Sequence, residues 1–440
     1  MESENQMKIM DVCQVTPASE SATELSLPLT FFDIIWLKFP PVERIFFYKL
    51  TELSPSFFNS VILPNLKHSL SHALLHFLPL AGNLTWPPQA TKPILLYTPN
   101  DGVELTVAES NADFHHLSGN GVREALASRL CIPELPVTDS KASVIALKIT
   151  LFPKQGFCIG ISSHHAIMDG KSSTMFIKAW AHMCKLSGRE KQQHPDLLPE
   201  LTPFFDRTDI QDPEGLEMAY LNNWSEHKWP GLDPNPRSLK LLPASVVLSS
   251  PVRATFELSD EDIKKLRARV SAQLAKQDSQ AKPAHLSTFV LVFAHASVCI
   301  VRSKRLESER MVLLAFAADC RTRLDPPIHE NYFGNCVTPC GWHTEAGSLS
   351  EENGYLRAVE RLSEFIRGLE NGGQLDFQVY GTDFGWGKPE KVETTSIDRT
   401  GAISMAESKD GKGGVEIGLV LEKNEMEKFT SLFVDGLKNH

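Results

Sequence analysis

Two adjacent histidines, His164 and His165, precede an aspartate, Asp169, that is followed by a glycine. An imidazole is the side chain best suited to accept a proton near neutral pH. The run 157–163 before the histidines has the alternation of a buried strand, and the run 171–184 after them has the apolar spacing of a helix. A strand and an Asp-Gly turn would therefore deliver a basic side chain into a cleft.

The two histidines cannot both serve one site from a regular strand. Successive side chains of a strand point to opposite faces, so His164 and His165 are predicted to point in opposite directions. His165 lies four residues before Asp169 and is the better candidate for a general base. A base within hydrogen-bond reach of an alcohol contributes a factor of roughly 10²–10⁴ to the rate. The rest of the rate enhancement must come from positioning the two reactants.

Three other interpretations fit a histidine in this setting. A core histidine with satisfied hydrogen bonds is the commonest fate of such a residue. A zinc site would need a third ligand at a supporting spacing, and the chain has neither a His-Glu-x-x-His helix nor a Cys/His cluster. A serine hydrolase would need a Gly-x-Ser-x-Gly elbow, which the sequence lacks. The spacing alone leaves the general base and the core histidine open.

Length and composition limit the class of protein. The chain has 440 residues, which suits two domains of about 200 residues each. Its net charge of −10 argues against a nucleic-acid partner, because phosphate binding needs clustered Lys and Arg. We expect no membrane span, no secretory signal at 1–23, and eight free cysteines in a reducing compartment. A cytosolic location follows.

The elements that must position the histidines can be read from periodicity and turn residues. A hairpin is predicted from 144–151 and 157–163, and 187–217 reads as a crossover between two domains, 1–186 and 218–440. The other predicted elements are helices at 64–78, 171–184, 260–274 and 355–369, a strand at 252–258, a hairpin from 401–408 and 415–421, and a terminal helix opened by Asn424 with Glu427.

A second unusual string, Asp383-Phe384-Gly385-Trp386-Gly387, lies far downstream. Together with His165-x-x-x-Asp169-Gly170 it resembles the paired signature of the plant BAHD acyltransferases. The likeness covers most of the chain, through the strings 27–33, 77–82, 319–323 and 332–336. It implies an α/β fold of two chloramphenicol-acetyltransferase-like domains, with the active site and a channel at their interface. The string Tyr332-Phe333-Gly334-Asn335-Cys336 is similar to the subgroup that malonylates glycosylated phenolics.

The resemblance implies a reaction in which His165 removes a proton from an acceptor hydroxyl. The alkoxide then attacks the thioester of an acyl-CoA, without a metal, a bound cofactor or a covalent acyl-enzyme. The favoured donor is malonyl-CoA, and the favoured acceptor is a phenolic glycoside such as an anthocyanin or another flavonoid glucoside, with the enzyme a monomer. The alternatives are an acetyl or hydroxycinnamoyl donor, an alcohol or amine acceptor, or a catalytically silent relative that only binds ligands.

The resemblance also implies roles for individual residues. Asp169 would turn away from the imidazole and pair with Arg321 to fix the loop. The string with Asp383, Gly385 and Gly387 would brace the domain interface and the CoA channel, although the indole N–H of Trp386 could instead donate to the oxyanion.

Further residues are candidates for substrate contacts, each with a plainer alternative. Lys171 could pair with the free carboxylate of a malonyl group, or be a solvated lysine at a helix start. Ser287 and Thr288 match positions that contact CoA, although a serine there also fits a helix N-cap. The aromatic side chains that could line an acceptor pocket, rather than belong to the core, are Phe31, Phe32 and Trp36.

The chain departs from the family pattern in one place. Between the predicted helix at 355–369 and Asp383, similar proteins carry more sequence than the short run Asn371-Gly372-Gly373-Gln374. We expect either a surface trim that the fold tolerates or a lost part of the second domain.

Overall fold

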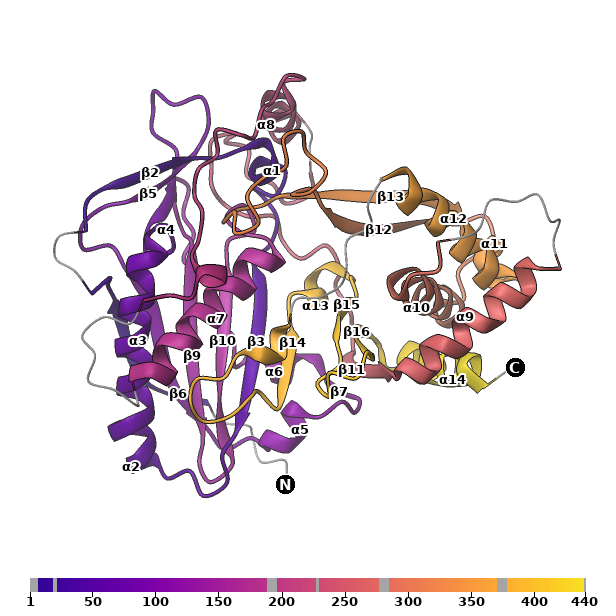
Figure 1. Cartoon of the computed structure of the whole chain (residues 1–440), viewed down its shortest axis with the longest axis horizontal. Helices are drawn as coiled ribbons and strands as arrows, with labels where there is room; N and C mark the ends of the chain where they lie inside the picture. The colour runs from indigo at the N-terminus through magenta and orange to yellow at the C-terminus, as the bar shows by residue number, and fades with distance from the viewer. Residues whose placement is uncertain are drawn as a thin grey trace. The chain divides into compact units, whose positions relative to one another are not determined.

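The computed structural model describes residues 7–18, 22–187, 196–226, 229–276, 285–369 and 378–438 (Figure 1). By packing, the chain forms two units. Unit 1 contains Met1–Val247, Ile328–Cys336 and Phe377–Ala402, and unit 2 contains Leu248–Pro327, Val337–Asp376 and Ile403–His440. The short run at 371–374 lies outside the described residues.

The bounds of these packing units differ from those of the predicted domains. Unit 1 continues through the predicted crossover at 187–217 and takes in two segments from far downstream. One of these segments carries Tyr332–Cys336 and the other carries Asp383–Gly387, so both strings belong to the same unit as the histidine motif. The domain limits 1–186 and 218–440 stay a prediction.

Unit 1 is built on a mixed six-stranded sheet with the order β1-β6-β9-β10-β3-β14. β6 and β9 are parallel, and the other neighbours are antiparallel. The bounds of its strands are β1 Met7–Val15, β3 Val42–Lys49, β6 Val103–Ser110, β9 Ile145–Phe152, β10 Gly156–Ser163 and β14 Lys391–Thr394.

The predicted hairpin of β9 and β10 is confirmed, and every residue of both strands is buried. The alternation is confirmed too. Phe157, Ile159 and Ile161 belong to one core cluster, and Cys158 belongs to another. Helices α3 (Leu63–His76) and α7 (Gly170–Ser187) supply apolar residues to the first cluster, and Figure 1 shows them beside each other over these strands. The strand that precedes the histidines, β10, therefore has both of its faces covered.

The remaining elements of unit 1 include the four strands of a second sheet, β2, β5, β4 and β8 in that order. They are β2 Leu25–Pro28, α1 Phe31–Ile34, α2 Pro55–Phe57, η1 Phe58–Ile62, α4 Leu78–Ala81, β4 Asn83–Thr85, β5 Ile94–Tyr97, α5 Phe114–Ser118, β7 Arg123–Glu124, α6 Ala125–Arg129, β8 Lys141–Ser143, η2 Pro199–Leu201, α8 Leu216–Glu226, η3 Val379–Gly381 and α13 Ile397–Thr400.

Unit 2 packs helices against antiparallel strands around its own core. β11 pairs with β16, which also pairs with β15, and β12 pairs with β13. The bounds are β11 Pro251–Leu258, α9 Asp260–Leu274, α10 Thr288–Lys304, β12 Met311–Asp319, β13 Val337–Glu345, α11 Ala346–Ser350, α12 Gly354–Gly368, β15 Ser404–Glu407, β16 Val415–Glu422 and α14 Lys423–Lys438.

The predicted elements agree with these bounds to within about three residues, as for β15, which begins at Ser404 instead of 401, but the predicted cap of the last helix is wrong. α14 begins at Lys423, one residue before the predicted cap, and the Asn424 side chain accepts from the N–H of Glu425, the next residue of the helix. By contrast, the helix predicted at 260–274 is confirmed at both ends, because Ser259 and Asp262 form a reciprocal capping box.

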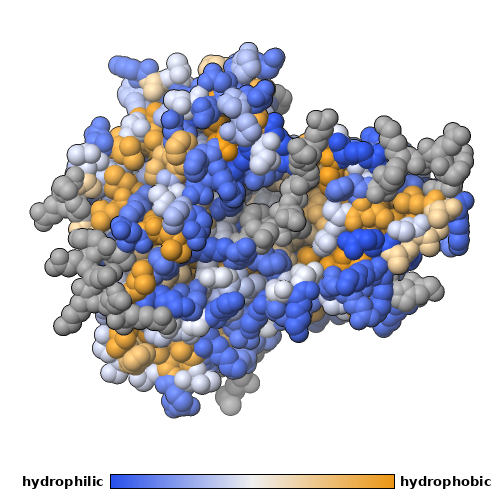
Figure 2. All heavy atoms as spheres, in the orientation of Figure 1, coloured by the Kyte–Doolittle hydropathy of each residue, from blue (hydrophilic) through white to orange (hydrophobic). Residues whose placement is uncertain are grey.

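The face of the molecule in Figure 2 mixes hydrophilic and hydrophobic residues, as on an ordinary protein surface. Among the described residues, no helix combines the length and the apolar character that crossing a bilayer requires.

Candidate functional site

The histidine pair lies in a turn at the end of β10, which ends at Ser163. The N–H of His164 still donates to the carbonyl of Val144 at 2.9 Å, and the N–H of Ile167 closes a turn on the carbonyl of His164 at 3.1 Å. The two imidazoles have different surroundings, as predicted. The turn after the strand, and not continued strand alternation, separates them.

His164 is a core residue. Its side chain is fully buried, and its Nδ1 accepts from the N–H of Ala166 at 3.2 Å. Burial lowers the pKa of His164 to about 3, and the charges of His165 and Lys38 act in the same direction. A neutral, enclosed imidazole of this kind supports the turn and does not exchange protons with a substrate.

His165 is half-buried, and its ring stacks on the indole of Trp36. The ring centroids are 4.4 Å apart and the planes are inclined by 14°. Burial lowers the pKa of His165 to about 4, against the opposing effects of its own carbonyl and of Asp169. Its Nδ1 has no hydrogen-bond partner among the described residues. Nε2 of the fully buried His164 is unpaired as well, so the feature that fits a general base is that the neutral His165 ring is only half-buried and can be reached by a substrate.

The low pKa of His165 predicts an unusual pH dependence. A base works only when unprotonated, so kcat/KM should stay level as the pH falls from 8 to about 5, where an unperturbed histidine near 6.5 would already be protonated. The measurement is a pH–rate profile with acyl-CoA below saturation. An acid limb centred near pH 6.5, with the protein still folded, would contradict this assignment.

Asp169 directs its carboxylate at backbone N–H groups. Oδ1 accepts from Ser172 at 2.9 Å and Oδ2 accepts from Cys336 at 3.1 Å. These contacts tie the first turn of α7 to the segment 328–336, as a loop-fixing role requires. Arg321 belongs to unit 2, where its guanidinium contacts Asp319 at 3.2 Å. Its pairing with Asp169 stays a prediction.

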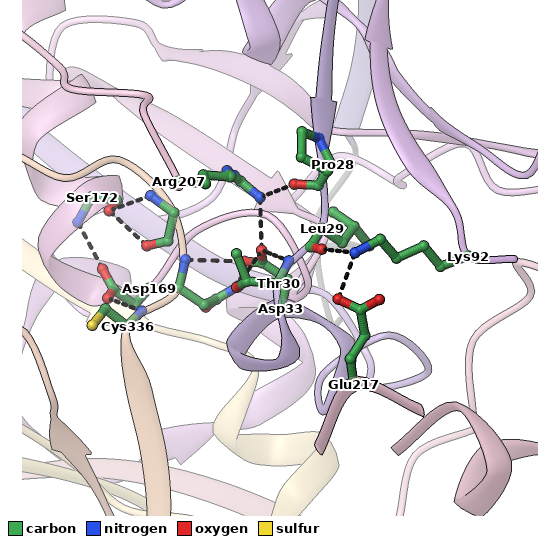
Figure 3. A network of polar contacts seen from close by, with 12 residues as sticks. Pro28, Leu29, Thr30, Asp33, Lys92, Asp169, Ser172, Arg207, Glu217 and Cys336 are labelled. Carbon is green, nitrogen blue, oxygen red and sulfur yellow. Dashed lines mark hydrogen bonds and ion pairs between the residues drawn. The ribbon is translucent and has the colours of Figure 1, made fainter. Parts of the chain in front are cut away.

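The string 332–336 has structural partners that the sequence did not reveal. The Ser172 hydroxyl donates to the carbonyl of Gly334 at 2.9 Å, and the N–H of Gly334 lies 3.1 Å from the same hydroxyl oxygen. The Asn335 side chain donates to the carbonyl of His165 at 3.0 Å and to Asp33 at 3.2 Å, and the backbone N–H of Asn335 also donates to Asp33 at 3.2 Å. Figure 3 shows Asp33 near the centre of a network of polar contacts that also contains Asp169, Ser172 and Cys336. No role was predicted for Asp33 or Asn335, although a carboxylate inside the apolar run 29–37 is an unusual signal.

Asp383 organises its own string as a tight turn. Oδ1 accepts from the N–H groups of Gly385 and Gly387 at 2.9 and 3.0 Å, and Oδ2 accepts from Lys185 at 2.6 Å. Both glycines have positive φ, 106° and 101°, which side chains with a Cβ rarely adopt. Aspartate and glycines are therefore needed for backbone reasons, and their bracing of the domain interface and the CoA channel stays a prediction.

The placement of Trp386 argues against a contact with the oxyanion. Its ring lies 6.2 Å from that of Phe157, at the beginning of β10. His165 follows the opposite end of this strand, and the six steps from Phe157 to Ser163 span about 20 Å. The indole N–H of Trp386, near Phe157, is thus far from any thioester carbonyl attacked by an alcohol that His165 deprotonates. Oxyanion stabilisation requires a donor within hydrogen-bond distance of that carbonyl oxygen.

The other predicted contact residues lie at several places in the fold. Lys171 is in the first turn of α7, with its Nζ 3.9 Å from a carboxylate oxygen of Glu330. Ser287 caps α10 by accepting from the N–H of Val290, as its plainer reading predicted, and Thr288 is the first residue of that helix. Phe32 is buried and Phe31 is half-buried, whereas the ring of the third aromatic candidate, Trp36, stacks on His165. Within the described ranges, no group of three His, Cys, Asp or Glu side chains could hold a metal.

Comparisons with known proteins place these features in a family. The model of the Transferase family matches residues 6–374 and 372–435, so the match breaks where the chain was predicted to be short. The chain is 43% identical to phenolic glucoside malonyltransferase 1 of Arabidopsis thaliana, covering 100% of the chain and 99% of that protein. It is also 43% identical to an anthocyanidin 5-O-glucoside malonyltransferase of Arabidopsis thaliana, covering 98% of each.

Two further relatives widen the comparison. Agmatine coumaroyltransferase of Arabidopsis thaliana is 40% identical, covering 98% of the chain and 100% of that protein. The crystal structure of vinorine synthase superposes with a TM-score of 0.67 at 21% identity, covering 97% of the chain and 98% of that structure. The predicted α/β fold of two chloramphenicol-acetyltransferase-like domains is confirmed by this likeness. With its full-length match and its histidine motif at the end of a buried strand, the chain belongs to the BAHD acyltransferases of the Transferase family and is an acyl-CoA-dependent acyltransferase.

Proposed function

We propose that this chain transfers the malonyl group of malonyl-CoA to a sugar hydroxyl of a phenolic glycoside. The observation that carries the proposal is His165, a neutral imidazole that is only half-buried and follows a fully buried His164. The identity of 43% to malonyltransferases named for phenolic glucoside and anthocyanidin glucoside acceptors supports the choice of donor and acceptor. In this proposal the enzyme works as a monomer in the cytosol, and its CoA contacts include Ser287 and Thr288.

The reaction follows from the state of the base. His165 takes the proton of the acceptor hydroxyl, and the oxygen forms a bond to the thioester carbonyl carbon. Collapse of the tetrahedral species breaks the C–S bond, and the CoA thiolate leaves with the proton that His165 returns. The products are the malonyl ester and free CoA, and the imidazole is neutral again. No group from outside the two substrates is consumed.

A second candidate keeps the same base but changes both substrates. Agmatine coumaroyltransferase, an enzyme named for a hydroxycinnamoyl donor and an amine acceptor, is 40% identical to the chain, nearly as close as the malonyltransferases. An amine acceptor would need the same deprotonation, so the geometry at His165 does not separate the two candidates. An assay that combines several donors with several acceptors separates the two candidates.

The decisive experiment is mass spectrometry of purified protein incubated with several donors and acceptors. Malonyl-, acetyl- and coumaroyl-CoA are each combined with phenolic glucosides and with agmatine. We expect malonylated glucosides to be the main product. Coumaroylagmatine would establish the second candidate instead. No product from protein shown by circular dichroism to be folded would indicate a silent relative, and no product from poorly folded protein would implicate the short run at 371–374.

Lys171 gives a specific prediction about the donor. Its contact with Glu330 is long, and both side chains are partly or mostly exposed, so the pair is weak and the ammonium can bind a malonyl carboxylate instead. Replacing Lys171 by Ala should raise KM for malonyl-CoA roughly two- to fivefold and leave that for acetyl-CoA unchanged, as an exposed ion pair is worth only about 0.2–1 kcal/mol.

The measurement is a competition between malonyl-CoA and acetyl-CoA. The matched control is Lys178→Ala, which removes a lysine two turns further along α7 whose side chain contacts Gln378. An unchanged donor ratio in the Lys171 variant would remove this residue from the donor site.

A further inference from the structure

The side chain of Asn335 connects two parts of unit 1 that are remote in sequence. Its Nδ2 donates to the backbone carbonyl of His165 at 3.0 Å and to Oδ1 of Asp33 at 3.2 Å. Both acceptors are oxygens, so the amide must present its nitrogen to them, and this fixes its orientation. Asn335 and Asp33 are fully buried, which makes each of these contacts costly to lose.

Asp33 is held rigidly in turn. Its Oδ2 accepts from the N–H and the hydroxyl of Thr30, at 2.9 and 3.0 Å, and from the guanidinium of Arg207 at 2.7 Å. Arg207 also donates to the carbonyl of Pro28 at 2.7 Å (Figure 3). The Oδ1 atom receives the backbone N–H of Asn335 at 3.2 Å in addition to the side chain. A buried carboxylate with this many donors is a fixed anchor.

Asp33 is also close in sequence to Trp36, the residue whose ring contacts His165. Asp33 is in α1, and Trp36 follows two residues after the end of that helix, with its ring stacked on His165. His165 thus receives one contact from the Trp36 ring at its imidazole and another from Asn335 at its backbone carbonyl. Trp36 follows Asp33 in the chain, and Asn335 is hydrogen-bonded to Asp33.

We propose that Asp33 and Asn335 form a latch that positions His165 for proton transfer. The latch fixes the backbone of the turn, and through it the direction in which the imidazole leaves the chain. It rests on the proposed role of His165 as the base. Neither residue touches the reacting atoms, so both are positioning residues. A misplaced base loses rate steeply, and displacements of about 1 Å can cost on the order of 100-fold.

The test begins with Asn335→Ala, in the full chain. We expect kcat to fall about 10- to 100-fold, with KM for malonyl-CoA unchanged. The matched control is Asn331→Ala. Asn331 lies in the same segment and also donates from Nδ2 to two backbone carbonyls, those of Pro199 and Thr202. Its side chain therefore bonds to a different part of unit 1 from Asp33 and His165. This control should keep wild-type kcat. If Asn335→Ala does not fold at the assay temperature, Asn335→Ser, which keeps one donor, is used with the same expectation.

A double-mutant cycle separates this proposal from the one it rests on. In a His165→Ala background, Asn335→Ala should cause no further loss of turnover, because its effect is transmitted through the imidazole. Full turnover of His165→Ala would overturn the base itself. A large loss in His165→Ala, together with wild-type kcat in Asn335→Ala, would overturn the latch alone. Additive losses would also overturn the latch, since they would assign Asn335 an effect independent of the base.

Discussion

Replacing His165 by Ala should lower kcat by roughly 10²–10⁴-fold, the contribution typical of a positioned general base. KM for the acyl-CoA should change little, because the imidazole acts on the acceptor proton. The residual rate would reflect positioning of the two substrates, which the variant retains. The measurement is steady-state kinetics with CoA release followed by a thiol reagent, and circular dichroism shows that the variant is folded.

The adjacent His164 supplies a matched control for this result. His164→Gln removes an imidazole from the same turn, but one that is fully buried and accepts from Ala166. We expect a lower unfolding temperature, because a buried contact is lost, and a kcat close to that of the wild type. Equal losses of kcat in both variants would mean that the turn, and not the chemistry of His165, limits the rate.

Replacing Phe384 by Ala should lower the free energy of unfolding by about 3–5 kcal/mol, as for other buried Phe-to-Ala changes. The ring is 1% exposed and packs edge-on against Trp180 and Tyr48, with centroids 4.9 and 5.7 Å away. Its loss opens a cavity where α7, β3 and the 378–402 segment meet. The measurement is urea unfolding followed by tryptophan fluorescence.

The same experiment tests what the downstream string is for. The downstream string lies near the beginning of β10, away from His165. The folded Phe384→Ala protein should therefore keep a kcat close to wild type at low temperature. Trp386→Phe, which removes the indole N–H but keeps an aromatic ring, should also stay active. A loss of about 10²–10³-fold in the Trp386 variant would instead restore the oxyanion role, because that is the cost of removing one such donor.

The sequence by itself determined most of the local structure around the site. Alternation in 157–163 correctly separated the two faces of β10, because the period of a strand is set by its own backbone. Helical spacing in 171–184 identified the buried face of α7, whose members Phe176, Ala179, Trp180, Met183 and Cys184 are all buried. The histidine motif and the downstream string also sufficed to recognise the family, which the full-length match confirms.

Tertiary structure decided which residues support the base. Asp33 and Asn335 are 302 positions apart, and no periodicity relates residues at that distance. The pKa of His165 likewise depends on burial and on its neighbours in the fold, not on the motif itself. The chain specifies helices and strands through nearby residues, but hydrogen bonds between remote segments form only once those elements have packed. The motif therefore indicated the proposed base, and the packing of unit 1 determined the contacts around it.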